Sequence, residues 1–312
     1  MKFSVIIPTY NGIETLRQSL PTWMSQTLPK EEYEVLVVDN CSTDGTKDVV
    51  ERMIVDKDNF HYLYEPRQGS TAARHAGVRE AKGNILVFAD DDGLFNPECL
   101  ERIQEVYDGN SECEAVTGKI ELLWDEEEPD WIEPYRFMLG ELNLGDEIQY
   151  GYDIYLNGGL MSVKRGTFER LHGFNPDLVG KHLIGDGDTG FVKKLFEEHC
   201  LIGYTPFAVM QHMQKVAIHG SESGLARHFY NNGTAEAYAF YRKNHFMMTK
   251  EVRKYKLNQK FWLWKKSFQY YVLRQMRRKT FFSIQQHKGA LRFFEYLRQP
   301  DLAELIKVEN VY

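Results

Sequence analysis

Residues 85–92 have the sequence Ile85-Leu86-Val87-Phe88-Ala89-Asp90-Asp91-Asp92, in which an apolar run leads directly into adjacent carboxylates. A short run of branched and aromatic residues without polar alternation predicts a strand that is buried on both faces. Further short strands are predicted over residues 3–7, 33–38 and 61–64, and segments with helical periodicity separate them. This alternation predicts an α/β fold with a mostly parallel sheet that helices cover on both faces.

Polar residues follow these strands where each one ends. Pro8-Thr9-Tyr10-Asn11 follows the first strand, Asp39-Asn40 the second, and Asp90-Asp91-Asp92 the fourth. The carboxyl ends of parallel strands lie along one edge of a sheet, and open α/β sheets bind their ligands beyond that edge. We therefore expect the three groups to converge on one crevice.

The acidic run suggests a metal site. Asp90, Asp91 and Asp92 repel one another unless a cation or hydrogen-bond donors neutralise them. Mg²⁺ and Mn²⁺ prefer oxygen ligands and commonly bridge protein carboxylates to substrate phosphates. The alternative is a solvated acidic loop ahead of the next helix, before Pro97. The position at the end of a buried strand favours the metal.

Other acidic residues suggest binding or catalysis. Asp39 can accept a hydrogen bond from a nucleobase or a ribose, or it can cap a turn before Ser42. The first strand is not followed by GxGxxG, and the chain contains no GxxxxGK[ST], which argues against NAD binding and a P-loop NTPase. Asp186 and Asp188 flank Gly187 at the start of a predicted helix. A carboxylate there can act as a general base or as a plain N-cap.

The charge of the chain is unevenly distributed. The 312 residues carry a formal net charge of −7, and their 43% hydrophobic content excludes a disordered or low-complexity architecture. Residues 1–252 contain 24 basic and 41 acidic residues, whereas residues 253–298 contain 13 basic residues and one acid. We expect two parts, a domain over 1–235 and a helical, basic and aromatic region over 236–312.

Neither a signal peptide nor a transmembrane helix is expected. The first apolar run stops at Pro8, and no run reaches the roughly 18 apolar residues that a spanning helix requires. The cysteines are scattered and form no CxxC pair, which is typical of a reducing compartment. The expected location is therefore the cytoplasm.

Residues 253–298 also hold twelve aromatic residues among their 13 cations. This composition is typical of interfacial helices, whose rings lie at headgroup depth while their cations contact anionic lipid at the inner face of the cell membrane. A helical subdomain with a solvated basic face is equally compatible with it, and an oligomer interface is a third interpretation. Nucleic acid is not expected as a partner, because the rest of the chain is acidic.

The chain resembles family 2 glycosyltransferases, which are inverting enzymes with the Rossmann-like GT-A fold that use nucleotide-sugar donors. The resemblance covers residues 2–235 and rests on seven motifs that follow one another in order. They are Val5-Ile6-Ile7-Pro8-Thr9-Tyr10-Asn11; Val37-Val38-Asp39-Asn40-Cys41-Ser42-Thr43-Asp44-Gly45-Thr46; Gly69 with Ala73-Arg74 and Gly77; Phe88-Ala89-Asp90-Asp91-Asp92 with Pro97; Gly158-Gly159 before Met161; Gly173-Phe174; and Gly185 to Leu195.

The resemblance implies roles for the matching residues. Those expected to bind the donor are Pro8, Thr9, Asn11, Asp39, Arg74, Asp90 and Asp91, and Asp39 would accept from the base. Those expected to hold Mg²⁺ or Mn²⁺ are Asp92, Asp90 and His212, with Asp92 as the direct ligand. Asp188 is expected to be the general base, with Asp186 as the alternative. Trp124 and Trp131, in an acidic loop, would stack on acceptor sugars or anchor the insertion to the core.

The implied function is metal-dependent transfer of a sugar, with inversion, from a nucleoside diphosphate donor, with UDP favoured. The acceptor would be a hydroxyl of a glycan or lipid-linked saccharide in cell-surface polysaccharide or glycoconjugate synthesis. Gly187 and Gly190 stand where the family usually carries acids. That departure leaves open a catalytically inactive nucleotide-sugar-binding protein, and the basic region leaves open a membrane-associated scaffold.

Overall fold

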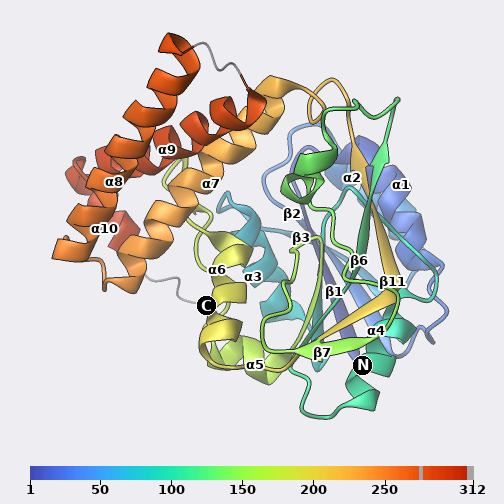
Figure 1. Ribbon diagram of the computed structural model, residues 1–312. Helices are drawn as coiled ribbons and strands as arrows, with labels where there is room; N and C mark the ends of the chain where they lie inside the picture. Colours follow the sequence, from blue (N-terminus) through green and yellow to red (C-terminus); the bar gives the residue numbers. More distant parts are fainter. Residues whose placement is uncertain (274–276, 308–312) are drawn as a thin grey trace.

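The computed structural model describes residues 1–273 and 277–307 (Figure 1). Within them, a nine-stranded sheet has the order β3-β2-β1-β4-β8-β6-β11-β5, and β7 pairs with β11. The strands are β1 (Phe3–Thr9), β2 (Tyr33–Asp39), β3 (Phe60–Tyr64), β4 (Ile85–Ala89), β5 (Gly93–Phe95), β6 (Ala115–Trp124), β7 (Gln149–Gly151), β8 (Leu160–Lys164) and β11 (Ile202–Gln214), with β9 (Leu178–Val179) and β10 (His182–Leu183) forming a separate hairpin. The helices are α1 (Ile13–Met24), α2 (Thr46–Ile54), α3 (Ser70–Glu80), α4 (Cys99–Gly109), η1 (Glu133–Leu139), α5 (Arg165–Arg170), α6 (Gly187–Glu197), α7 (Glu222–Lys243), α8 (Lys250–Ser267), η2 (Phe268–Val272), α9 (Arg278–Tyr296) and α10 (Pro300–Lys307).

The sheet is mostly parallel, as predicted. Strands β1, β2, β3, β4, β6 and β11 point one way, and β5, β7 and β8 run against them. Every residue of β1, β2 and β4 is buried. That burial explains why these strands have no polar alternation, since both of their faces are covered.

Two apolar cores lie on opposite faces of the sheet. Side chains of α1, α2 and α4 pack against one face, and Trp23 is the largest of them. Side chains of α3, α5 and α6 pack against the other face, where Phe168, Phe174 and Phe191 form edge and tilted ring contacts with one another. The α/β prediction is therefore confirmed as a sandwich of three layers.

Helices α7 to α10 form a further layer beside α3 and α6 (Figure 1). Their apolar side chains, with Tyr238 and Phe293 at the centre, enclose Val179 and Ile184 from the β9–β10 segment. Phe282 of α9 packs with Leu139 of η1 in a smaller cluster. The boundary expected at residue 235 falls inside the continuous helix α7, which begins at Glu222. The division into two parts stays a proposal, and we place its start at α7.

The described helices include none that is both long and apolar enough to span a membrane. The basic segment predicted over 253–298 occupies α8, η2 and α9, and its Arg274 lies outside the described residues.

Strand register brings the polar strand ends to one edge of the sheet. Thr9 lies opposite Asp39 in the parallel pair of β1 and β2. Ala89, the last residue of β4, lies opposite Leu160, the first residue of β8, so the loop that contains Gly158 meets the acidic run. His212 lies opposite Gly93, directly after that run. The predicted convergence on one edge is a consequence of these pairings.

Candidate active site

Arg74 links two of the candidate carboxylates. It projects from α3, is buried, and donates from one Nη to Oδ1 of Asp90 at 2.7 Å and to the Gly158 carbonyl at 3.0 Å. Its other Nη lies 3.7 Å from Oδ2 of Asp188 at the start of α6. A buried cation between two acids holds both carboxylates at fixed positions, because each loses its counter-charge if it moves.

Asp91 points back toward the first strand. Its Oδ2 accepts a hydrogen bond of 2.5 Å from the Thr9 hydroxyl. Burial raises the pKa of Asp91 to about 7, and the bond from Thr9 opposes that rise. A Cβ added to Gly12 would lie 2.2 Å from this oxygen. A side chain at position 12 would therefore collide with Asp91, and glycine is the residue that fits there.

Asp92 faces His212 of β11. Asp92 Oδ1 is buried and lies 3.3 Å from Nε2 of His212, without the alignment of a hydrogen bond. Burial acts to lower the pKa of His212, but the contact with Asp92 and the charge of Asp90 raise it. This oxygen is the polar atom of the acidic run that is buried without a hydrogen-bond donor among the described residues.

The pair fits a divalent cation. In the described part of the chain, no three acidic, histidine or cysteine side chains gather into a complete metal cluster. An orphaned carboxylate oxygen beside an imidazole nitrogen instead offers two ligands. Mg²⁺ and Mn²⁺ sites of this kind are completed by water and substrate phosphates. Asp90, the third expected ligand, is bonded to Arg74 in this structure.

The two candidate bases have different surroundings. The side chain of Asp188 is 39% exposed and lies beside Arg74, next to Gly158. The side chain of Asp186 is 2% exposed, accepts a hydrogen bond of 2.8 Å from Asn175 and lies 3.6 Å from Lys193, and burial raises its pKa. Only the first of these carboxylates can meet a substrate without a rearrangement of the core.

Asp39 and Asn11 order the loop after β1 and β2. Asp39 is buried and accepts from the Ser42 N–H and the Tyr62 hydroxyl, both at 2.8 Å. Asn11 adopts a left-handed conformation with φ of 53° and accepts from the Thr43 N–H at 2.8 Å. A carboxylate has about four lone pairs, so Asp39 retains acceptor capacity for a further donor. Pro8 is buried within β1, next to Thr9.

Both tryptophans take part in packing. Trp124 and Trp131 lie against the small cluster of η1, α7 and α9. The Arg278 guanidinium lies over the Trp131 ring, 4.8 Å from its centroid. The Phe282 ring stacks with the Trp131 ring, and the two centroids are 6.3 Å apart. Of the two roles expected from the sequence, these contacts favour anchoring the insertion, and an acceptor role remains a prediction.

Sequence reasoning did not identify the contacts of Thr9 with Asp91 and of Tyr62 with Asp39. Thr9 and Asp91 are 82 positions apart in the sequence, and Tyr62 lies in the middle of its strand rather than at the strand end. Gly158 belongs to the Gly-Gly motif of the sequence, but the reason why a glycine is needed there is visible only in the structure. A Cβ there would lie 2.0 Å from Asp188 Oδ2 and 3.0 Å from Arg74.

Gly158→Ala is expected to displace the Asp188 carboxylate and to lower turnover by about tenfold or more, because a small misplacement of a reacting group is costly. Circular dichroism and donor turnover measure the two effects separately. Gly166→Ala is the matched control, since a Cβ at Gly166 meets no atom within 4 Å. Equal turnover in both variants would contradict the placement of Asp188.

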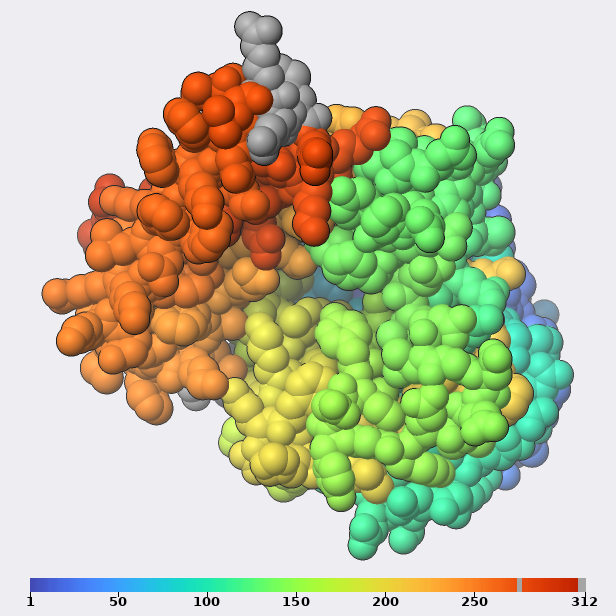
Figure 2. Space-filling view, viewed as in Figure 1, coloured from blue at the N-terminus to red at the C-terminus, as the bar shows by residue number. Residues whose placement is uncertain are grey.

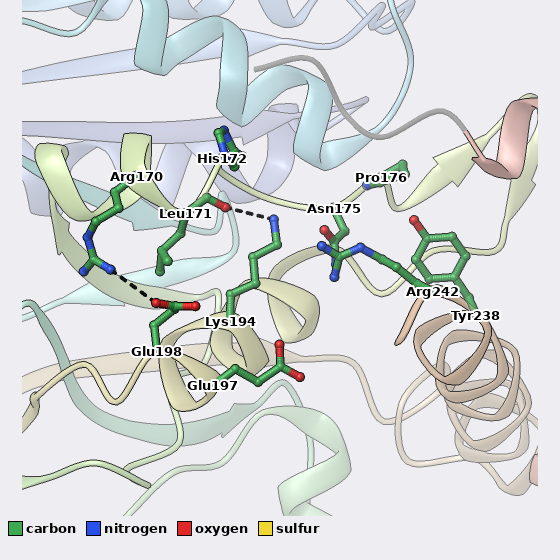
Figure 3. A pocket seen from close by; sticks show the side chains of 10 residues that line it. All are labelled: Arg170, Leu171, His172, Asn175, Pro176, Lys194, Glu197, Glu198, Tyr238 and Arg242. Atoms are coloured by element: carbon green, nitrogen blue, oxygen red, sulfur yellow. Dashed lines mark hydrogen bonds and ion pairs between the residues drawn. The ribbon is translucent and has the colours of Figure 1, made fainter. Parts of the chain in front are cut away.

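A separate pocket of about 400 Å³ lies between α5, α6 and α7 (Figure 3). Arg170 and Glu198 pair across one end of it, and Lys194 donates to the Leu171 carbonyl beside them. None of the candidate site residues lines this pocket. Figure 2 shows that the surface is hollowed where three parts of the chain meet: the helical layer, the green segment that follows β6, and yellow α6. Blue residues of the N-terminal part lie at the bottom of the hollow.

Comparison with known proteins finds a family similar to the first part of this chain. Residues 4–148 match the family model described as glycosyl transferase family 2. The matched residues, a little under half of the chain, are therefore similar to glycosyl transferase family 2. This segment contains β1 to β6, with the Thr9, Asp39 and Asp90–Asp92 positions of the family 2 motifs.

Two curated relatives are similar to part of this chain. Glycosyltransferase AglE of Haloferax volcanii is 42% identical over 122 residues, which cover 39% of this chain and 40% of AglE. Poly(ribitol-phosphate) beta-N-acetylglucosaminyltransferase TarS of Staphylococcus aureus is 39% identical over 103 residues, 32% of this chain and 18% of TarS. The matches thus span less than half of either relative.

Solved structures extend the likeness beyond the family 2 segment. Mannosyltransferase PcManGT of Pyrobaculum calidifontis, in complex with GDP-Man and Mn²⁺, has a TM-score of 0.56 at 20% identity and covers 97% of this chain and 73% of its own. TarS 1-349 in complex with UDP-GlcNAc has a TM-score of 0.53 at 18% identity, covering 94% and 92%. At these identities the likeness shows the fold, which is GT-A-like, as predicted.

Proposed function

We propose that this chain transfers a sugar from a nucleoside diphosphate donor to a hydroxyl acceptor, with inversion at the anomeric carbon. The observation that carries the proposal is the meeting of Asp90 and Asp188 on Arg74. It places the acidic run at the end of β4 beside an accessible carboxylate at the start of α6. An inverting displacement requires a site for the leaving diphosphate and a base for the attacking hydroxyl.

The donor is proposed to lie along the carboxyl ends of β1, β2 and β4. Asp39, fixed by Ser42 and Tyr62, would accept from a base N–H, and a UDP-sugar fits this acceptor best. Arg74 and Asp91 would contact the diphosphate and the ribose or sugar hydroxyls, with Asp90 held on Arg74. Structural neighbours solved with UDP-GlcNAc and GDP-Man support a nucleotide sugar as the donor class.

Asp92 and His212 are the residues that would hold Mg²⁺ or Mn²⁺. When bound, such an ion offsets the negative charge that develops on a departing diphosphate. The carboxylate of Asp92 and the imidazole of His212, 3.3 Å apart, would set where that charge is neutralised. Mn²⁺ in the PcManGT structure supports a divalent cation for this fold.

Asp188 is proposed to remove the proton from the acceptor hydroxyl. The freed oxygen forms a bond to the anomeric carbon while the bond from that carbon to the diphosphate oxygen breaks, and the nucleoside diphosphate departs with the electron pair. Attack opposite the leaving group inverts the configuration. The Arg74 guanidinium, 3.7 Å from Oδ2 of Asp188, would help to position this carboxylate for that step.

The acceptor is proposed to be a growing glycan or a lipid-linked saccharide in the synthesis of a cell-surface polysaccharide or glycoconjugate. The relative TarS, which is named for transfer to poly(ribitol-phosphate), supports this class. The surface is hollowed between α6, the segment that follows β6 and the helical layer, and we propose that the acceptor enters there (Figure 2). Trp124 and Trp131 are proposed to anchor the loop between them to the cluster of η1, α7 and α9.

A thermal-shift screen of nucleotide sugars tests the donor proposal. We expect a UDP-sugar with Mn²⁺ to raise the unfolding midpoint, because a ligand that binds only the folded state stabilises it. UDP alone should give part of the shift, and chelation of the metal should reduce it. A panel in which no nucleotide sugar shifts the midpoint with Mn²⁺ present would contradict the proposal, and with it the inactive nucleotide-sugar-binding alternative.

A further inference from the structure

Helix α8 exposes an apolar stripe on its outer side. Leu257, Phe261, Trp264 and Phe268 are spaced by four, three and four residues, so they share one helical face. Leu257 is 63% exposed and Trp264 is 64% exposed. Exposed Val272 follows in η2. A contiguous exposed apolar surface of this kind marks an interaction site.

The other side of α8 already has its partners. Val252 is fully buried, and Tyr255 stacks on Phe240 of α7 at 4.6 Å. Gln259 bonds to His287 of α9 at 2.6 Å. The helix is therefore held by its inner face, and the stripe adds nothing to that packing. In Figure 1, α8 lies on the outer side of the helical layer, away from the sheet.

Cations flank the stripe on both sides. At about 100° per residue, Lys254 and Lys265 fall on one flank, while Arg253 and Lys260 fall on the other. The helix contains one acid, Glu251, in its first turn. This arrangement joins an apolar centre to a basic border, which is the pattern of a helix that lies in a membrane interface.

We propose that the outer face of α8, continued by η2, docks this protein on an anionic lipid bilayer. The rings of Phe261, Trp264 and Phe268 would enter the headgroup region, where aromatic side chains are favoured. The flanking lysines and arginine would contact lipid phosphates, each with a modest gain. The inference stands on the α8 surface alone and does not require that the donor or acceptor proposals hold.

Other occupants fit the charge of this face less well. A second copy would bring its own lysines against those of the first, whereas paired helices usually match Lys with Glu beside the apolar seam. Nucleic acid would stack on the rings but would gain nothing from the aliphatic Leu257 and Val272. The apolar centre with its basic border favours lipid over both.

Vesicle co-sedimentation of the full chain tests the proposal. We expect binding to phosphatidylcholine vesicles that contain about 30% phosphatidylglycerol, weaker binding as salt rises, and little binding to pure phosphatidylcholine. Phe261→Gln with Trp264→Gln should weaken binding by about tenfold or more, since it removes the rings and keeps the helix propensity. Lys260→Gln with Lys265→Gln should weaken it chiefly on anionic vesicles.

The matched control replaces exposed apolar residues of the α/β part, Val55→Gln with Phe207→Gln, and should bind as the wild type does. Circular dichroism verifies that each variant is folded. If the double variant of Phe261 and Trp264 does not fold, the double variant of Lys260 and Lys265 still tests the proposal. Failure of the wild type to sediment with anionic vesicles would overturn the proposal. So would a dimer in light scattering that the aromatic pair dissociates, because a second copy would then cover the stripe.

Discussion

Asp188→Asn is expected to lower donor-sugar turnover by about a thousandfold while donor binding is kept, because an amide cannot take the proton of the acceptor hydroxyl. The side chain lies at the start of α6, 3.7 Å from an Arg74 nitrogen and 39% exposed. An asparagine of nearly the same shape leaves Gly158 and Thr189 undisturbed. Initial rates of nucleoside diphosphate release give turnover, and the ligand-induced thermal shift gives donor binding.

Asp186→Asn is the matched control, since it makes the same substitution two positions earlier. Asp186 is bonded to Asn175, and its side chain is 2% exposed and lies beside Lys193 rather than Arg74. We expect its variant to keep turnover within about threefold of the wild type, with a lower unfolding midpoint because a buried carboxylate network is broken. A large loss in this variant with full turnover in Asp188→Asn would reverse the two roles.

Asp92→Ala is expected to abolish metal dependence and to lower turnover by about a thousandfold, the scale of several kcal/mol of lost charge stabilisation in the transition state. Its Oδ1 is the buried oxygen that lies 3.3 Å from His212 without a hydrogen bond. Removing it leaves His212 as a single ligand. The measurement is the Mn²⁺ titration of both turnover and the unfolding midpoint in the presence of UDP.

The control for the metal prediction is Asp56→Ala, an exposed acid after α2 and away from the crevice. It should show the wild-type Mn²⁺ response. If Asp92→Ala kept an unchanged Mn²⁺ midpoint and turnover, Asp92 would not be a ligand, and Asp90 would have to leave Arg74 to take that role.

The sequence allowed the sheet and its functional edge to be predicted, because both follow from local patterns. An apolar strand that ends in Asp90 has few alternatives, and parallel pairing then aligns Thr9 with Asp39. The division into two parts stays a prediction. The boundary expected at residue 235 lies inside α7, which begins at Glu222.

The details of the site could not be predicted, because they depend on side-chain directions set by distant contacts. Asp186 and Asp188 are two positions apart, and Gly187 between them has a φ of +45°. That left-handed turn sends the two carboxylates to different sides, one to Asn175 and one toward Arg74. From the sequence, Trp131 could either stack on an acceptor sugar or anchor its loop. In the structure the Arg278 guanidinium lies over its ring, which favours anchoring.

We propose that this protein transfers a sugar from a nucleotide donor and that Asp188 is the base. The site is the crevice between the end of β4 and the start of α6. The most direct measurement is Mn²⁺-dependent release of UDP from a panel of UDP-sugars, with simple glycosides as acceptors, by the wild type and by Asp188→Asn. We expect the wild type to release UDP only when Mn²⁺ is present, and we expect the variant to release none although it still binds the donor. Equal release by both proteins, or a donor that binds with Mn²⁺ and is never turned over by the wild type, would contradict the proposal.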